Sequence, residues 1–152
     1  MILHEEPAEY DNWIRLLFLI PVGLVIGAIF LAYSQEYAGF LVLLGDSAFL
    51  TLLFYFIMPR KYQIYQDKLR IVLGAPIGIN IPLSTIKEVK HASGAKAFVY
   101  TGVKRVKFAT SSRNVLEIVR NKGLNYIISP KNGDIFLEQL NQAIKSQTLN
   151  RC

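Results

Sequence analysis

The chain has 152 residues, of which 52% are hydrophobic, and a formal net charge of +6. It contains one cysteine, Cys152, and two histidines, His4 and His91, that lie far apart in the sequence. These counts exclude an intrachain disulfide and argue against a Cys/His metal site, because no metal-ligand spacing is present. We therefore expect neither a metal nor another cofactor.

Residues 1–12 carry four acids, namely Glu5, Glu6, Glu9 and Asp11. We expect this segment to be an acidic cytoplasmic tail that charge attraction draws toward the basic C-terminal part of the chain. Its negative charge also argues against a cleaved signal peptide, whose first residues are positively charged.

Residues 13–59 contain two apolar runs, Leu16–Tyr33 and Ala38–Met58. Each is close to the roughly 20 residues that a helix needs to cross a hydrocarbon core. Their length, their lack of amphipathic periodicity and their few charges argue against buried helices of a soluble protein. Only Ser34–Tyr37 separates the runs, so two spanning helices would form an antiparallel hairpin.

The positive charges predict the orientation of this hairpin. Four cations, Arg60, Lys61, Lys68 and Arg70, follow the second run, whereas the connecting loop has none and the preceding tail has only Arg15. Lys and Arg near the ends of spanning helices prefer the cytoplasmic side. The sequence therefore predicts a multi-pass protein of the cell's inner (plasma) membrane with both termini in the cytoplasm.

Asp46 lies near the middle of the second apolar run. A carboxyl at that depth costs at least about 2.5–3.5 kcal/mol and usually faces protein. It can pair with another subunit, form a hydrogen bond within the hairpin or belong to an ion path; a lone acid makes a poor relay, so we favour partner contact or packing. Gly23, Gly27 and Gly45 add small residues that let helices approach closely, and we expect them to pack the hairpin on itself.

Residues 60–147 show short strand patterns separated by turn residues. The pattern predicts strands at 62–65, 69–73, 78–81, 86–91, 97–101, 103–109, 115–119 and 125–128. Many short strands with regular turns indicate an all-β sandwich or barrel. The period then changes, and Phe136, Leu140, Ala143 and Ile144 form one stripe of an amphipathic helix. Residues 148–152 are expected to be a short tail.

The stretch from Tyr62 to Ile144 resembles the bacterial PH-like (pleckstrin-homology-like) domains found beside transmembrane helix pairs. The resemblance is carried by "YQIYQDKLRIV", "IPLSTIKEV" and "NYIISPKNGDIFLEQL". It implies an α+β membrane protein in which a seven-stranded bent β-barrel, capped by a C-terminal helix, follows the helical hairpin. It implies no particular ligand, and we assign no head-group site, because the Lys/Arg pattern of phosphoinositide-binding PH domains is not identifiable here.

Residues 60–152 hold 16 Lys and Arg against five acids, a net charge of +11. Lys104, Arg105 and Lys107 form the densest basic stretch. We expect this basic surface to contact anionic lipid, where each nearby cation contributes about 1 kcal/mol. A merely solvated strand face is the alternative. Nucleic acid is not an expected partner, because only Phe108 accompanies these cations and no known binding motif is present.

The sequence contains no Gly-rich phosphate loop, no Ser/His/Asp set and no cluster of carboxylates, so we expect no catalytic residues and no enzymatic activity. The expected function is a non-catalytic, membrane-anchored PH-like interaction or scaffolding module at the cytoplasmic membrane surface. The alternative is an accessory subunit of a larger membrane complex that associates through the Asp46 face of the hairpin. The expected protein partner is another membrane protein or a second copy of the chain.

Overall fold

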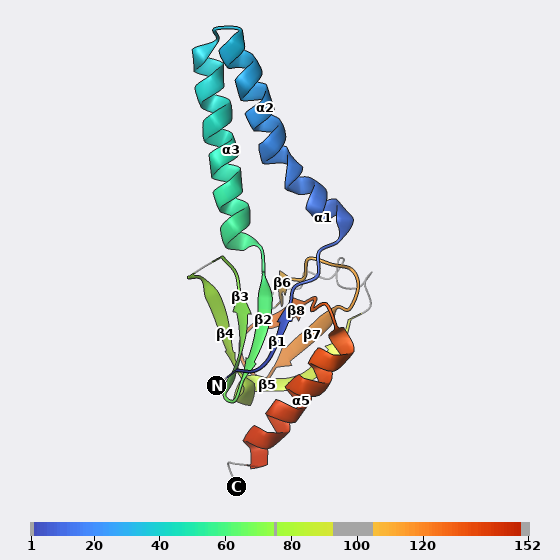
Figure 1. The fold of residues 1–152 in the computed structure, drawn as a ribbon. Helices are drawn as coiled ribbons and strands as arrows, with labels where there is room; N and C mark the ends of the chain where they lie inside the picture. Colours follow the sequence, from blue (N-terminus) through green and yellow to red (C-terminus); the bar gives the residue numbers. More distant parts are fainter. Residues whose placement is uncertain (1, 75, 93–104, 150–152) are drawn as a thin grey trace. The chain divides into compact units, whose positions relative to one another are not determined.

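A computed structural model describes residues 2–74, 76–92 and 105–149 (Figure 1). For residues 148 and 149 it describes the backbone alone. The expected strand at 97–101 and the cation Lys104 lie outside the described residues. The chain divides into two compact units. One contains Asp11–Ile57, and the other combines Met1–Tyr10 with Met58–Cys152.

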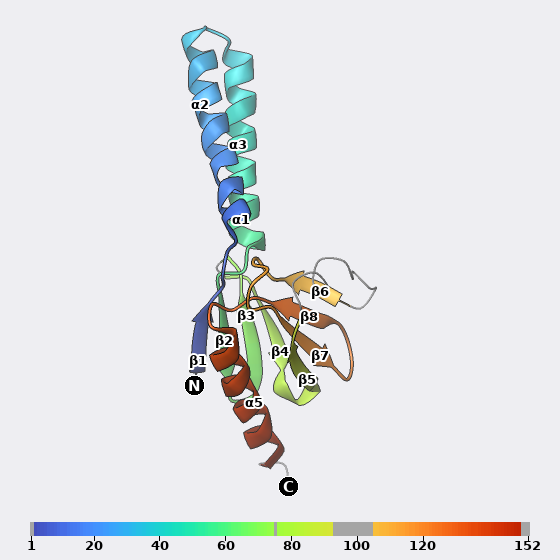
Figure 2. The same ribbon diagram turned by 90° about the vertical axis from the view of Figure 1, so that its right-hand side faces the viewer.

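The first unit is a helical hairpin. It consists of α1 (Asn12–Leu17), α2 (Leu19–Tyr33) and α3 (Tyr37–Ile57). Helices α2 and α3 lie side by side in both views (Figures 1 and 2). Gln35 takes a left-handed conformation (φ 62°) in the tight turn between them. The predicted hairpin is thus present, and Asn12–Tyr33 and Tyr37–Ile57 are long and apolar enough to cross a membrane.

The second unit contains two four-stranded sheets. The first has the order β1 (Ile2–Pro7), β2 (Lys61–Tyr65), β3 (Lys68–Val72) and β4 (Gly78–Pro82), with antiparallel neighbours. The short helix η1 (Leu83–Thr85) leads to the second sheet. Its order is β5 (Ile86–His91), β7 (Leu116–Arg120), β8 (Asn125–Ile128) and β6 (Arg105–Phe108). Helix α5 (Gly133–Leu149) follows.

Most predicted strands in the described residues are confirmed within one residue of their bounds. Two details differ. Strand β6 pairs in parallel with β8, a non-local contact that the strand pattern did not indicate. The described residues contain eight strands, whereas the family resemblance implied seven. The unexpected strand is β1, which lies before the helices in the sequence.

Strand β1 occupies the segment that we expected to be an acidic tail. It pairs antiparallel with β2, with Glu5 opposite Gln63 and Pro7 opposite Lys61. The sequence of β1, Ile-Leu-His-Glu-Glu-Pro, is poor in the β-branched and aromatic residues that favour strands. Its strand conformation therefore depends on the partner strand, which lies more than 50 residues away in the sequence.

The residues just after β1 join the two sheets. On one side, the Ala8 N–H donates to the Arg60 carbonyl at 2.9 Å. On the other, the Glu9 N–H donates to the Ser129 carbonyl at 2.9 Å, and the Lys131 N–H donates to the Pro7 carbonyl at 3.0 Å. The N-terminal segment thus bridges β2 and the chain beyond β8. The helical hairpin is an insertion between two adjacent strands of one sheet.

The core lies between the sheets and α5. Alternate residues of β2 and β3 point inward, so that Tyr62, Ile64, Leu69 and Ile71 are fully buried. Helix α5 contacts β1, β2, β5 and η1, and the predicted stripe of Phe136, Leu140 and Ala143 is buried there, with Ile144 packed against it (Figure 2). Burying each large apolar side chain stabilises the fold by about 1.5–3 kcal/mol.

This topology predicts that the helices can be bypassed. Replacing Asp11–Ile57 with a short Gly/Ser linker should yield a soluble domain that unfolds cooperatively in urea. The matched protein without residues 1–10 should lose more than about 3 kcal/mol of unfolding free energy, because it loses the backbone bonds of β1 on both sides. Circular dichroism measures both transitions. Equal stability of the two proteins would show that β1 is not an integral strand.

Candidate interaction surfaces

A buried polar network joins β2 to the ends of β6 and β8. The Ser129 side chain is fully buried, and its Oγ accepts hydrogen bonds from the Thr110 N–H at 2.9 Å and the Ser111 N–H at 3.2 Å. The Tyr62 hydroxyl donates to the Phe108 carbonyl at 2.9 Å and accepts from the Ser129 N–H at 3.3 Å. Burial raises the pKa of Tyr62, which stays neutral. The Ile-Ser-Pro step noted in the sequence is therefore a structural element.

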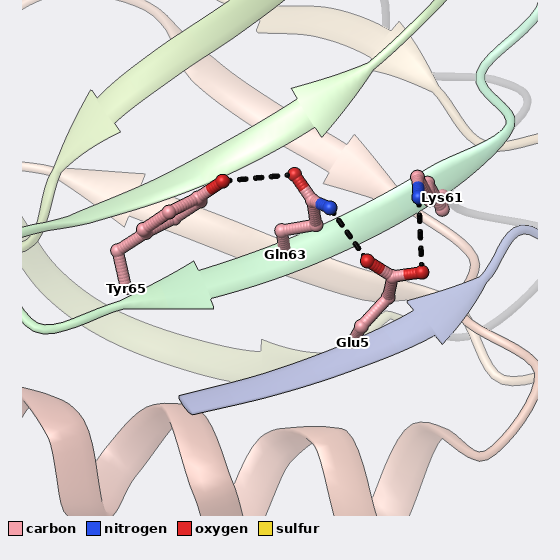
Figure 3. Close-up of polar contacts among 4 residues, drawn as sticks. All are labelled: Glu5, Lys61, Gln63 and Tyr65. Carbon is pink, nitrogen blue, oxygen red and sulfur yellow. Dashed lines mark hydrogen bonds and ion pairs between the residues drawn. The ribbon is translucent and has the colours of Figure 1, made fainter. Parts of the chain in front are cut away.

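A second polar network lies on the face of the first sheet that points away from the core, called here the outer face. Figure 3 shows Glu5 of β1 beside Lys61, Gln63 and Tyr65 of β2. The Lys61 Nζ lies 3.0 Å from Glu5 Oε1, the Gln63 amide donates to Glu5 Oε2, and the Tyr65 hydroxyl donates to Gln63 Oε1 at 3.2 Å. The hydrogen bonds from Gln63 and Lys61 lower the pKa of Glu5. This network uses both Glu5 oxygens and the Gln63 carbonyl.

Strand β3 adds two cations to the outer face. Lys68 Nζ lies 5.5 Å from the centroid of the Tyr65 ring, within cation–π range. Arg70 is partly buried, and its Nε is a covered nitrogen with no hydrogen-bond partner among the described residues. The Arg70 side chain packs against Gly78 of β4, a position where a Cβ would lie only 2.9 Å from the Arg70 Nε. The strand pattern predicts that Lys68 and Arg70 lie on the face opposite Leu69 and Ile71, but the environment of Arg70 depends on its pairing with β4.

The predicted basic surface contains a structural ion pair. Arg105 Nε lies 3.0 Å from Glu117 Oε1, and Lys90 Nζ lies 3.9 Å from Glu117 Oε2. The contact with Arg105 is electrostatic, because its geometry does not form a hydrogen bond. Glu117 is only 7% exposed, so Arg105 compensates a nearly buried carboxylate. Lys107 is exposed two residues further along β6. Glu117 looked isolated in the sequence, and strand pairing brings it beside these cations.

The three glycines singled out in the helices have different environments. A Cβ on Gly27 would lie 3.3 Å from Leu43 Cδ1, so this glycine belongs to the contact between α2 and α3. Gly23 and Gly45 have no atom within 4 Å of a built Cβ. A Cβ on Gly39, which we had not singled out, would lie 2.8 Å from Leu31 Cδ1, so the two helices approach closely there. Of the expected set, Gly27 packs the hairpin on itself.

Asp46 is exposed on the hairpin, one position before the buried Ser47. The Ser47 hydroxyl donates to the Pro21 carbonyl of α2 at 3.0 Å. Thr51 donates to the Ser47 carbonyl at 2.8 Å. Neither of these polar neighbours bonds to Asp46, and none of the hydrogen bonds or ion pairs within the described residues involves its side chain. The polar contact between the helices is therefore made by Ser47 and leaves the carboxyl on the outside.

Among the described residues, no group of three or more His, Cys, Asp and Glu side chains is placed to hold a metal ion. Several acids of the sheet unit instead take part in separate pairs, as with Glu5 and Lys61 or Glu117 and Arg105. The arrangement in this part of the chain is one of polar and charged surfaces around a closed apolar core.

A family model described as bacterial PH domain matches residues 60–143, more than half of the chain. The chain belongs to the bacterial PH-domain family. This confirms the resemblance noted in the sequence. The match covers β2 to most of α5 and leaves out β1, which this member supplies from the N-terminal side of its helices. No curated protein and no solved structure gives a significant match.

The buried network predicts the effect of Ser129→Ala. The substitution removes the acceptor of two buried N–H groups and should lower the free energy of unfolding by about 1–3 kcal/mol. Urea unfolding of the soluble domain described above measures this change. Ser84→Ala, at an exposed serine, is the matched control and should stay within about 0.5 kcal/mol of the parent. An equal effect of both substitutions would mean that Ser129 is not a stabilising acceptor.

Proposed function

We propose that this PH-domain protein is a non-catalytic interaction and scaffolding module that its helical hairpin anchors in the cytoplasmic membrane. The observation that carries the proposal is the insertion of the hairpin between β1 and β2. A family domain whose chain is interrupted by two apolar helices is tied to the bilayer at two points of one sheet. Two attachment points fix a binding module at the surface more firmly than a single flexible linker does.

The same insertion supports a definite topology. Strands β1 and β2 are hydrogen-bonded neighbours, so a membrane-spanning hairpin between them has both of its ends on one side. The cations that follow α3 favour the cytoplasm for that side. The two sheets are joined through the residues after β1, and α5 packs against both of them. This arrangement supports the bent barrel that the family implies.

Contact with anionic lipid is part of this proposal and is generic in kind. The excess of positive charge in residues 60–152 supports it, since juxtamembrane cations are attracted to the negatively charged inner leaflet. Arg105 and Lys107 are both exposed on β6, and Glu117 offsets part of the Arg105 charge.

The topology is the first test. Reporter fusions should show cytoplasmic activity at the C-terminal Cys152 and periplasmic or extracellular activity at Gln35 in the α2–α3 turn. A third fusion before Met1 should behave as the one at Cys152, because β1 and β2 share a sheet. Cytoplasmic activity at Gln35 would refute membrane spanning by the hairpin.

The second candidate function is an accessory subunit of a larger membrane complex. The exposure of Asp46 favours it, because an unpartnered carboxyl at the middle of a membrane helix is costly when it faces lipid. A helix of another protein, or of a second copy, that offers a hydrogen-bond donor at this depth would relieve the cost. In this case the hairpin is the working interface and the PH domain caps the assembly.

Substitutions at Asp46 distinguish the two candidates. Asp46→Leu should leave insertion intact but reduce co-purification of membrane partners in mild detergent at least about tenfold, the effect of removing one buried charge-assisted contact. Asp46→Asn should retain much of the association, because it keeps the hydrogen-bonding shape. Phe49→Leu, at an exposed position one turn away, is the matched control. Wild-type association by Asp46→Leu would remove the support for the accessory subunit and leave the surface module.

A further inference from the structure

The cations on the outer face of the first sheet differ in their pairing. Lys61 is held by Glu5 at 3.0 Å. Lys68 lies over the face of the Tyr65 ring, and neither Lys68 nor Arg70 has an ion pair with any described residue. Lys68 and Arg70 are two positions apart on β3, so both point to the outer face and their backbone positions are about 6.5–7 Å apart.

Arg70 is the more informative of the two. Its Nε is covered and has no hydrogen-bond partner among the described residues. The acceptors on the β2 side of Arg70 are already engaged, since Glu5 binds Lys61 and Gln63, and the Gln63 carbonyl binds Tyr65. The guanidinium packs closely against Gly78 of β4, where a Cβ would lie 2.9 Å from the Arg70 Nε. A partly desolvated cation gains more from an incoming carboxylate than a fully solvated one, because water screens the attraction less.

We propose that Arg70 and Lys68 form a binding site for an extended acidic segment of a partner protein. In an extended peptide, side chains at positions i and i+2 lie on one face and are about 7 Å apart, which matches the spacing of the two cations. The planar guanidinium of Arg70 can donate a two-pronged hydrogen bond to one carboxylate, and the Lys68 ammonium attracts the next.

The charge pattern of the outer face favours a peptide over the membrane surface. Glu5 lies on the same face, on strand β1, two strands away from Arg70. A plane of anionic lipid heads pressed against this face would meet that carboxylate, whereas a peptide lying along β3 meets only the two cations. This inference rests on the proposed role of the protein as an interaction module.

Binding can be measured with the full-length protein in nanodiscs of zwitterionic phosphatidylcholine. The probe is a fluorescein-labelled peptide of alternating Ser and Glu, and its anisotropy reports the dissociation constant. Arg70→Gln should weaken binding about tenfold, as expected for loss of a charge-assisted contact, and Arg70→Lys should have an intermediate effect. Lys87→Gln on β5 makes the same change in charge at an exposed position and is the matched control, with an expected change below twofold.

A second variant tests the site without removing Arg70. Asn80 is the residue of β4 paired with Arg70, so Asn80→Asp places a carboxylate beside the guanidinium and should compete with the peptide. Weaker binding by Arg70→Gln and by Asn80→Asp, with Lys87→Gln unchanged, supports the site. Wild-type binding by both variants, or no binding of the peptide by the parent protein, overturns it.

Phosphatidylserine vesicles without peptide form the lipid arm of the experiment. If Arg70→Gln weakens binding to these vesicles and not to the peptide, the site belongs to a lipid surface and the peptide assignment is wrong. Failure of the acidic site is distinguishable from failure of the proposed function. Co-purifying partners retained by Arg70→Gln would leave the interaction module standing without this surface.

Discussion

The hydrogen bonds on both sides of the N-terminal segment are the interaction on which the sheet unit depends. Residues 7–9 bind the chain around Arg60 on one side and residues 129–131 on the other. The N-terminal segment is the only described piece of chain outside residues 58–149 that enters this unit. A free peptide of this length would lose much conformational entropy on binding, and a few backbone hydrogen bonds offset that cost only in part. The hairpin keeps β1 tethered to its partner strand.

This arrangement has consequences for folding and for anchoring. Strand β2 emerges only after both helices have been synthesised, so β1 waits for its partner while the intervening segment forms its hairpin. The pairing of β1 with β2 joins residues far apart in the sequence. Closing the long loop between them loses conformational entropy before the strand contact stabilises the chain. Pre-forming the hairpin shortens the effective separation of the two strands. The helices thus form the connection between two paired strands, and in the proposed function they are also the anchor.

The density of charge in the sequence is a poor guide to the charge that a partner meets. Arg105 belongs to the densest basic stretch, yet strand pairing places it against the nearly buried Glu117. Arg70 has one cation close by in the sequence, Lys68, yet it carries a covered nitrogen without an acceptor among the described residues. A cation that is already paired with an acceptor of its own fold is less available to a partner. Pairing within the protein therefore decides which cations can take part in recognition.

The sequence by itself determined the local elements and the class of the protein. Apolar runs of sufficient length predicted α2 and α3, alternation and turn residues predicted most strands, and the stripe from Phe136 to Ala143 predicted the buried face of α5. These features follow from periodicity within a short window, and the motif around Ser129 adds the family.

The tertiary structure decided which segments pair. Strand β1 has no strand signal of its own, β6 runs parallel to β8, and Glu117 meets Arg105 only through the sheet. Asp46 was visible in the sequence, but its place outside the helix contact depended on which neighbour, Ser47, turned inward. Register and partner choice are set by contacts between residues far apart in the chain, and no local pattern contains them.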